Sequence, residues 1–323
     1  MPPTRSLVTG GAGFIGSHVV RRLLELGHEV RVIDNLVTGF RHNLEEVSDS
    51  IDFQVADIRE PRACEKAVQH VDVIFHVAAL PSVPRSLADP IGTHETNVNG
   101  TLNLLEAGRR AGVRRFVYSS SSSAYGDTPV LPKVESMEPL PRSPYAAAKL
   151  SGELYTLAYA RAGLIEGIAL RYFNIFGPRQ DPNGPYAAIV PLLFRAAMTG
   201  SPITIFGDGR QTRDFTYVDN AVDANLLAAQ RDAVHVSGHV VNVGAGSRIS
   251  LLDLVEFVED VVGTKVHVLH APDRAGDVRD SQASLARAES VLGYQPAVDV
   301  REGIKRLWAW YSAHPKAVET AKV

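Results

Sequence analysis

The stretch TGGAGFIGSH, residues 9–18, decides the fold class of this chain. Gly10, Gly13 and Gly16 recur at every third position, between the apolar run RSLVTG and a helix-like apolar pattern. Such a loop lets the backbone turn sharply and approach a pyrophosphate, which the positive N-terminus of the following helix attracts. A glycine pattern alone often marks only a tight turn, so the flanking segments decide between the two interpretations.

The segments on both sides of the loop complete a βαβ unit. Apolar residues recur at helical spacing through residues 14–26, and EVRVIDN, residues 29–35, has the pattern of a second strand. Asp34 ends this strand, where a carboxylate would accept hydrogen bonds from the ribose of adenosine and repel a 2′-phosphate. Asn35 follows it, and no arginine adjoins the pair. The unit therefore predicts dinucleotide binding, with NAD favoured over NADP.

Strand and helix patterns continue to alternate along the first half of the chain. Strands are predicted at 51–58, 72–80 and 113–121, and helices at 61–71 and 89–112. Short apolar strands alternating with helices indicate an α/β fold with a doubly wound parallel sheet. The carboxyl ends of its strands line the ligand crevice. Asp57, Ala78, Ala79, Leu80 and the serine run 119–123 all stand at such ends.

The five serines at 119–123 have the composition of a flexible linker, but a core strand precedes them and ends at the crevice. Downstream, Tyr145 and Lys149 stand four residues apart near the start of an amphipathic helix, so they share one helix face. The ammonium is expected to lower the pKa of the phenol, which is ordinarily near ~10. A serine hydroxyl bridging phenol and substrate would complete a proton relay.

The bulk composition bounds the remaining functions. The chain has 323 residues and a formal net charge of −3, with no basic excess that would indicate nucleic acid or an anionic membrane surface. Cys64 is the only cysteine, which excludes an internal disulfide, and no histidine spacing typical of a metal site occurs. No metal is therefore expected. No signal peptide or bilayer-spanning run is evident, so a cytoplasmic protein is expected. Cys64 and His76 are interpreted as packed side chains.

The longer motifs resemble a known family, the extended short-chain dehydrogenase/reductases. Within it, the chain is similar to NAD-dependent UDP-galactose and UDP-N-acetylglucosamine 4-epimerases over nearly its whole length. The resemblance rests on TGGAGFIGSH, SSSSSAYGD, YAAAK, LRYFNIFGPRQDPNGPYAAIVP, GDGRQTRDFTYV and RAGDVRDSQA. It implies a Rossmann-type domain over residues 1–175, to which about 215–245 returns, and a smaller α/β substrate domain over 176–323. It also implies a UDP-sugar substrate and a homodimer formed through helices near 92–111 and 143–163.

The resemblance assigns roles to individual residues. The catalytic group is Ser121, Tyr145 and Lys149. The residues expected to bind NAD are Gly10, Gly13, Phe14, Ile15, Gly16, Asp34, Asn35, Asp57, Ile58, Ala78, Ala79, Leu80, Ser119, Tyr145, Lys149 and Tyr172. The residues expected to bind the UDP-sugar are Ser82, Ser122, Ser123, Asn174, Arg179, Ala188, Ile189, Phe206, Arg213, Arg274, Asp277 and Ser281. Two of these residues have a second interpretation. Phe206 could stack on uracil or be an aromatic of the core, and Asp277 could accept from a ribose hydroxyl or pair with Arg279.

Residues 122 and 123 separate the members of this family. Related dTDP-sugar 4,6-dehydratases carry Asp and Glu there, and UDP-glucuronate decarboxylases carry Glu at the second position, whereas Ser122 and Ser123 are hydroxyls. The resemblance therefore implies epimerisation, in which Tyr145 removes the 4-hydroxyl proton, hydride passes to NAD, and hydride returns to the other face of the 4-keto sugar. The alternatives are a dehydrogenase or reductase that releases NAD(H), and a non-catalytic dinucleotide-binding protein.

The identity of the sugar depends on one position. Ser281 aligns with the family's gatekeeper, where a bulky aromatic excludes an N-acetyl group, so the small serine favours UDP-GlcNAc/UDP-GalNAc with UDP-Glc/UDP-Gal as well. Arg179 leaves UDP-glucuronate open, because a guanidinium pairs with a carboxylate.

Overall fold

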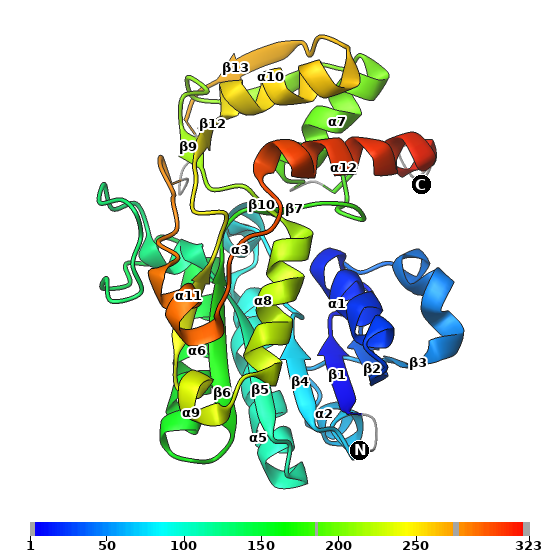
Figure 1. The fold of residues 1–323 in the computed structure, drawn as a ribbon, viewed down its shortest axis with the longest axis vertical. Coiled ribbons are helices and arrows are strands. Elements are labelled where there is room, and N and C mark those ends of the chain that lie inside the picture. Colours follow the sequence, from blue (N-terminus) through cyan, green and yellow to red (C-terminus); the bar gives the residue numbers. More distant parts are fainter. Residues whose placement is uncertain (1–3, 185–186, 274–277, 319–323) are drawn as a thin grey trace.

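The fold is built on a seven-stranded parallel sheet in the order β11-β6-β5-β4-β1-β2-β3 (Figure 1). The computed structural model describes residues 4–184, 187–273 and 278–318. The strands are β1 (Arg5–Thr9), β2 (Glu29–Asp34), β3 (Ile51–Val55), β4 (Val73–His76), β5 (Arg115–Ser121), β6 (Glu166–Tyr172) and β11 (Val240–Val243). The strand order reverses between β1 and β4, which opens a crevice at their carboxyl ends. The predicted doubly wound sheet is confirmed.

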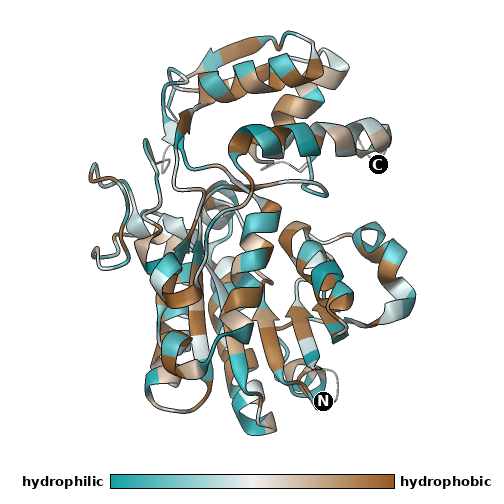
Figure 2. Ribbon diagram, viewed as in Figure 1, coloured by the Kyte–Doolittle hydropathy of each residue, from teal (hydrophilic) through white to brown (hydrophobic). Residues whose placement is uncertain are grey.

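Both faces of the sheet are buried, because neighbouring residues along each strand enter different cores. Leu7 and Phe116 face one hydrophobic core, while the adjoining Val8 and Val117 face the other. The brown strands in Figure 2 reflect this double burial. The helices on one face are α1 (Phe14–Glu25), α8 (Val218–Gln230) and α11 (Ala286–Leu292), and those on the opposite face are α2 (Pro61–Ala67), α5 (Gly100–Ala111) and α6 (Pro144–Arg161).

The long helix predicted over 89–112 is interrupted. It runs as α4 (Pro90–His94), a π-helical turn η2 (Glu95–Asn99) and α5. The Asn97 side chain in this turn accepts from the Leu80 N–H at 2.7 Å and donates to the Leu80 carbonyl at 3.0 Å. Single π-turns inside helices are frequent at functional sites. This one fixes the loop after β4, which continues into α3 (Val83–Ala88).

A smaller lobe lies above the sheet in Figure 1. Its elements are α7 (Ile189–Thr199), β8 (Ile203–Phe206), α10 (Leu251–Val262), β13 (Val268–Ala271) and α12 (Val300–Ala313). Between the lobe and the sheet, β7 (Ile175–Phe176) pairs with β10 (Thr216–Tyr217), and β9 (Thr212–Arg213) pairs with β12 (Ile249–Ser250). The short elements η1 (Arg41–Ser50), η3 (Ser122–Tyr125), α9 (Ala233–Val236) and η4 (Pro315–Val318) complete the fold.

The elements α8, α9, β11 and α11, which follow β6 in the sequence, lie on the sheet and not in the smaller lobe. β11 pairs with β6, α8 packs against β5 and β6, and α11 packs against β11. The segment that returns to the sheet therefore includes α8 and β11. Helix α11 returns to the sheet separately, after α10 and β13.

Candidate functional site

The glycine loop packs so closely against its neighbours that two of its positions have no room for a side chain. Gly10 has φ of +68°, and a Cβ there would stand 2.7 Å from the Cα of Ala78 at the end of β4. A Cβ on Gly16 would stand 2.1 Å from the carbonyl oxygen of Gly10. Gly13 caps α1 without a side-chain hydrogen bond, which leaves the first N–H groups of the helix open to an anion. The loop therefore forms the backbone cradle that a pyrophosphate requires.

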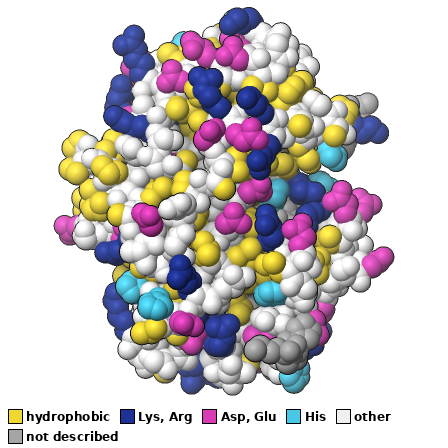
Figure 3. Space-filling model, viewed as in Figure 1, with side chains coloured by type: hydrophobic (Ala, Val, Ile, Leu, Met, Phe, Trp, Pro, Cys, Tyr) yellow, Lys and Arg dark blue, Asp and Glu magenta, His cyan; other side chains and the backbone are white. Residues whose placement is uncertain are grey.

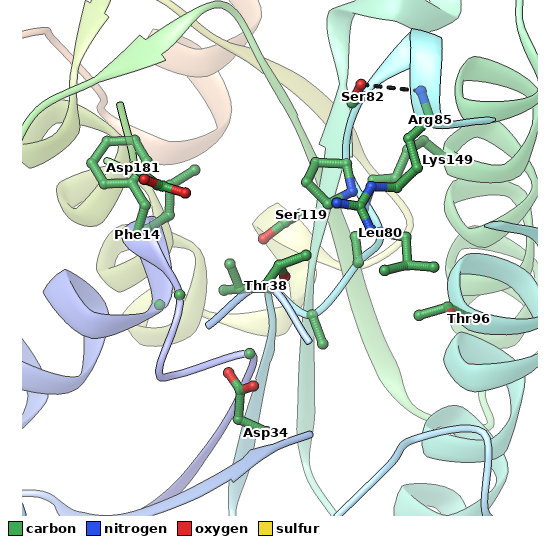
Figure 4. A pocket seen from close by; sticks show the side chains of 18 of the residues that line it. Phe14, Asp34, Thr38, Leu80, Ser82, Arg85, Thr96, Ser119, Lys149 and Asp181 are labelled. Atoms are coloured by element: carbon green, nitrogen blue, oxygen red, sulfur yellow. Dashed lines mark hydrogen bonds between the residues drawn. The ribbon is translucent and has the colours of Figure 1, made fainter. Parts of the chain in front are cut away.

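A pocket of about 600 Å³, called here the larger pocket, lies at the carboxyl ends of the central strands (Figure 4). Its volume is within the ordinary range for a cofactor site. Of the residues predicted to bind NAD, those that line it are Gly10, Gly13, Phe14, Ile15, Gly16, Asp34, Asn35, Ile58, Ala78, Ala79, Leu80, Ser119, Tyr145, Lys149 and Tyr172. Asp57 does not line it; its carboxylate accepts from the Asn35 amide at 2.8 Å and pairs with Arg59 at 2.8 Å.

Asp34 is held at the base of the larger pocket by backbone groups. Its carboxylate accepts from the Ala12 N–H at 3.0 Å and from the Leu36 N–H at 2.8 Å. Burial raises the pKa of Asp34, and the two backbone hydrogen bonds oppose this rise. In Figure 4 the carboxyl group stands apart from the Ser119 and Lys149 end of the pocket, as a ribose contact at the adenosine end would.

A second pocket of about 380 Å³, called here the smaller pocket, adjoins the first. Lys133, Arg142 and Arg213 line it, and its described lining includes no Asp or Glu. Such a wall favours an anionic ligand, since guanidinium and ammonium groups pair with phosphate or carboxylate oxygens. The residues common to both pockets are Phe14, Ile15, Ser120, Tyr145, Tyr172, Asn174 and Gln180.

Tyr145 stands in this shared wall, next to Ser121. Ser143 caps α6 by accepting from the Ala146 N–H at 3.2 Å, which places Tyr145 in the first turn of the helix. Burial raises the pKa of the Tyr145 phenol, and a hydrogen bond with Ser121 opposes the rise. The net pKa of Tyr145 is therefore raised and not lowered as predicted, because burial of the phenol outweighs the hydrogen bond with Ser121.

Lys149 lies one turn further along α6 and is itself strongly affected by burial. Its side chain is almost inaccessible, and its ammonium stands 4.5 Å from the centroid of the Tyr118 ring. Burial lowers the pKa of Lys149 to about 7, and the Glu153 carboxylate opposes this shift. Burial and the Glu153 carboxylate therefore act in opposite directions on the charge of this amine.

The structure brings several of the predicted sugar contacts together in the smaller pocket. Ser122, Ser123, Asn174, Arg213 and Ser281 line it. The Asn174 amide donates to the Ser281 hydroxyl at 3.3 Å, which joins the end of β6 to a segment 107 residues later in the sequence. Two more predicted contacts line the larger pocket, Ser82 and Ala188.

Other predicted sugar contacts lie elsewhere. Arg179 lines neither pocket among the described residues; its guanidinium pairs with Glu46 of η1 at 3.2 Å. Ile189 begins α7 and packs against the main core, and Phe206 ends β8, where it pairs with Ala271 of β13. Arg274 and Asp277 lie outside the described residues.

Lys133, Arg142 and Gln180 are among the pocket-lining residues that were not predicted. Lys133 and Arg142 belong to the segment 127–142, which projects at the side of the molecule in Figure 1 before α6 begins. Lys133 reaches the smaller pocket because its backbone pairs with Gln282 at 2.7 Å, a long-range contact that no local pattern indicates. Gln180 follows Arg179 in GPRQD. The motif therefore predicted the correct segment, but the pocket is lined by Gln180 and not by the predicted Arg179.

His76 and Cys64 are packed, as predicted. The His76 ring is buried between the hydroxyls of Thr9 at 2.7 Å and Thr101 at 2.8 Å. The Cys64 thiol is buried, and burial raises its pKa to about 12.

Neither a metal-binding cluster nor a membrane-spanning helix is present in the described part of the chain. No three His, Cys, Asp or Glu side chains within residues 4–184, 187–273 and 278–318 are grouped to hold a metal ion. In the same part of the chain, no helix combines the length and apolarity that crossing a bilayer requires. On the face shown in Figure 3, basic and acidic side chains are interspersed and form no extended field of one sign.

Comparisons with known proteins agree with this geometry. The profile of the NAD dependent epimerase/dehydratase family matches residues 6–244. The UDP-glucose 4-epimerase of Mycolicibacterium smegmatis is 42% identical over 306 residues, which cover 94% of this chain and 96% of that one. The crystal structure of the Thermotoga maritima UDP-glucose 4-epimerase with UDP-glucose is 37% identical and superimposes with a TM-score of 0.91 over 97% of this chain and 100% of that one.

A structure from Methanobrevibacter ruminantium carries a different sugar. It is a UDP-N-acetylglucosamine 4-epimerase in complex with UDP-N-acetylmuramic acid, 36% identical, with a TM-score of 0.91 over 97% of this chain and 100% of that one.

Proposed function

Because the chain belongs to the NAD dependent epimerase/dehydratase family, we propose that it catalyses C4 epimerisation of a UDP-hexose with NAD as its resident cofactor. The observation that carries this proposal is the hydrogen bond between Ser121, which lines the smaller pocket, and Tyr145, which lines both pockets. A sugar in the smaller pocket and a nicotinamide in the larger one would meet at this phenol. The absence of carboxyl groups at Ser122 and Ser123 supports epimerisation over dehydration.

The larger pocket fits NAD on three points. The glycine loop leaves no room for a Cβ at Gly10 or Gly16, the first N–H groups of α1 have no side-chain cap, and Asp34 presents a carboxylate for ribose hydroxyls. When bound there, NAD supplies a reversible hydride acceptor beside the sugar. We assign the cofactor to residues 1–175 together with the returning segment near 215–245, and the sugar nucleotide mainly to residues 176–323.

The proton chemistry is assigned to three side chains. Tyr145 removes the 4-hydroxyl proton and returns a proton after the ketone has turned, with Ser121 as the bridge between phenol and substrate. Lys149 in its charged form binds the nicotinamide ribose and favours the phenolate form of Tyr145. Since burial alone raises the pKa of the phenol, a nearby cation is what this site needs in order to make Tyr145 a base.

The smaller pocket is assigned to the UDP-sugar. Arg213 and Lys133 are suited to the diphosphate, and Asn174 with Ser281 presents neutral hydrogen-bonding groups to the sugar. The small Ser281 side chain supports an open C2 position, so we propose UDP-GlcNAc/UDP-GalNAc as the principal pair and UDP-Glc/UDP-Gal as a second one.

UDP-glucuronate is the second candidate substrate, with Arg142 in place of Arg179 as the group that would meet its carboxylate. Arg179 is paired with Glu46, and Asp181 lines the larger pocket, where its charge would repel a carboxylate. Arg142 lines the smaller pocket with Ser122 and Ser123, and one nitrogen of its guanidinium pairs with Asp127 at 2.8 Å, so a sugar carboxylate would share this arginine with Asp127.

We also propose that the protein is a cytoplasmic homodimer. Leu87, Ile91, Leu154 and Tyr155 are exposed on α3, α4 and α6, which pack against one another and would present one apolar surface to a second copy. Leu157, on the other side of α6, is buried in the second core. Light scattering with size-exclusion chromatography should give a mass of two chains for the wild type and a mass of one chain for Leu154→Glu.

Proton NMR of the purified protein tests the function directly. UDP-GlcNAc, UDP-Glc and UDP-GlcA are incubated separately without added NAD, and a new anomeric signal from the C4 epimer is followed. A UDP-GalNAc signal supports the principal proposal, and a signal from UDP-GlcA alone moves the specificity to Arg142. Accumulation of free NADH would indicate a dehydrogenase. No change in any tube after NAD is supplied would indicate a dinucleotide-binding protein without this catalysis.

A further inference from the structure

Glu153 is a buried acid behind the site that the proposed function does not use. It follows Tyr145 and Lys149 on α6 at successive intervals of four residues, so the three side chains share one helix face. Only 2% of Glu153 is exposed. Its carboxylate accepts from the Ser120 hydroxyl at 2.7 Å and from the Arg171 guanidinium at 2.6 and 2.9 Å.

Both partners of Glu153 adjoin residues of the pocket walls. Ser120 precedes Ser121 at the end of β5, and Arg171 precedes Tyr172 at the end of β6. The carboxylate therefore joins the catalytic helix to the two strand ends at the level of the site. A rotation or slide of α6 against β5 would break these bonds, and it would also change the contact between Ser121 and Tyr145.

The charge of Glu153 also acts on Lys149. The other titratable or charged groups around that ammonium are His76 from β4, Tyr118 from β5, Arg171 from β6, Arg85 from α3 and Tyr145 from α6 itself. Burial keeps the imidazole and both phenols in their neutral forms, because it lowers the pKa of His76 and raises the pKa values of Tyr118 and Tyr145. Glu153 is thus the member of this group that carries a negative charge, and it raises the pKa of Lys149 against the effect of burial.

We propose that Glu153 is a positioning residue of the reaction: its carboxylate fixes α6 against the ends of β5 and β6 and keeps the Lys149 amine charged. The inference rests on the proposed function, since the role of Lys149 is assigned there. An ion pair buried for stability alone is weakly favoured, because the cost of desolvation offsets most of the attraction. A role in the site explains why a charged pair stands at this place.

The test compares Glu153→Gln with Glu166→Gln. Glutamine keeps the shape of Glu153 and an oxygen that can accept from Ser120, but it removes the charge. Glu166 pairs at 2.7 Å with Arg115, which is buried at the opposite end of the same two strands. The control therefore also removes a carboxylate from a buried arginine, but far from Lys149.

The first measurement is NMR of protein labelled at the lysine Cε, titrated with and without NAD, with the Lys149 signal assigned by Lys149→Met. Removing the negative charge disfavours the ammonium, so Glu153→Gln should move the Lys149 midpoint to lower pH by on the order of one unit. In epimerisation assays, kcat should fall about tenfold with KM nearly unchanged, and the alkaline limb of the kcat profile should move to lower pH. Glu166→Gln should leave the midpoint, kcat and the profile as in the wild type.

A second variant keeps the test decisive where Glu153→Gln does not fold. Glu153→Met with Arg171→Met removes both buried charges in similar volumes, a replacement that proteins often tolerate. The proposal expects the same fall in kcat from it, and a Lys149 midpoint that moves to lower pH by less than in Glu153→Gln, because losing the Arg171 charge favours the ammonium. A Lys149 midpoint equal to that of the wild type in either folded variant overturns the proposal. A wild-type protein that epimerises no UDP-sugar contradicts the proposed function, while the lysine titration, which needs no substrate, still decides the effect of Glu153 on Lys149.

Discussion

The two pockets that meet at Tyr145 are built from different parts of the polypeptide. The larger pocket depends on the backbone: the glycine loop and the strand ends approach so closely that Gly10 and Gly16 have no space for a side chain. The smaller pocket depends on side chains. Ser121, Lys133 and Arg213, for example, come from separate segments that only the folded chain brings together.

This difference has a chemical consequence. A pocket shaped by backbone recognises what all dinucleotides share, and single side-chain changes there either do little or prevent binding sterically. A pocket shaped by side chains can be changed one contact at a time, so under the proposed function the choice of sugar should be set there. Substitutions in the two pockets should accordingly have different kinetic signatures.

The largest effect is expected at Tyr145, one of the residues that line both pockets. Tyr145→Phe removes the proton-transferring hydroxyl, so kcat should fall about 10³-fold while bound NAD and substrate KM remain nearly unchanged. Stopped NMR assays give kcat, and absorbance of the denatured supernatant gives bound NAD. The control is Tyr159→Phe, the same change on the same helix away from the pockets, and it should retain activity. Near-normal turnover in Tyr145→Phe would refute the assignment.

Gly10→Ala should break the larger pocket. A Cβ at residue 10 would stand 2.7 Å from the Ala78 backbone, and this overlap alone should cost about 1–3 kcal/mol. The left-handed φ of this residue adds further strain for any side chain. NAD should be lost on purification, and the unfolding temperature should fall. Gly27→Ala is the matched control, since Gly27 also has a positive φ of +78° but nothing within 4 Å of its Cβ position. If both variants keep NAD equally well, close approach is not what the loop requires.

Arg213→Ala should affect the smaller pocket alone. Losing a charge-assisted contact to phosphate costs about 1.5–3 kcal/mol, so the KM for the UDP-sugar should rise about 10–100-fold with NAD content unchanged. Arg210→Ala removes an exposed arginine three residues earlier and should leave KM unaltered. An equal rise in both variants would mean that only overall charge attracts the substrate.

Ser281→Tyr should alter the choice of sugar. A bulky ring at this position in the smaller pocket would overlap an N-acetyl group, so the ratio of kcat/KM for UDP-GlcNAc to that for UDP-Glc should fall about tenfold or more. Competition between the two sugars in one NMR tube measures the ratio. Ser281→Ala, which removes the bond from Asn174 without adding bulk, should leave the ratio near that of the wild type.

The smallest effect concerns stability and pH. Burial lowers the folded pKa of Lys149 to about 7, below its ordinary value of 10.5, so the unfolded chain binds more protons between these values. The Lys149 contribution to the free energy of unfolding should therefore rise as pH increases from about 7 to about 10. Urea unfolding of the NAD-free wild type and Lys149→Met at several pH values isolates this contribution. A constant difference between them would show that the lysine titrates normally.

Local sequence patterns predicted the larger pocket better than the smaller one, for a physical reason. The glycine spacing and strand ends act over a few residues, so most predicted NAD contacts line the larger pocket, Asp57 excepted. Lys133 reaches the smaller pocket only through its pairing with a segment about 150 residues later. Arg179 does not line either pocket because it pairs with Glu46 of η1, a helical segment that was not predicted. The Tyr145 pKa was misjudged because burial depends on tertiary structure.

The path of β11 has a consequence for how such a protein can be divided. The chain leaves the sheet after β6, passes through the smaller lobe, returns to add α8 and β11, and leaves again before α11 comes back (Figure 1). A cut after β6 would expose that strand as a bare edge, open to pairing with other chains. The smaller lobe is therefore not a unit that a single fusion can exchange, because the polypeptide that forms it enters and leaves the sheet more than once.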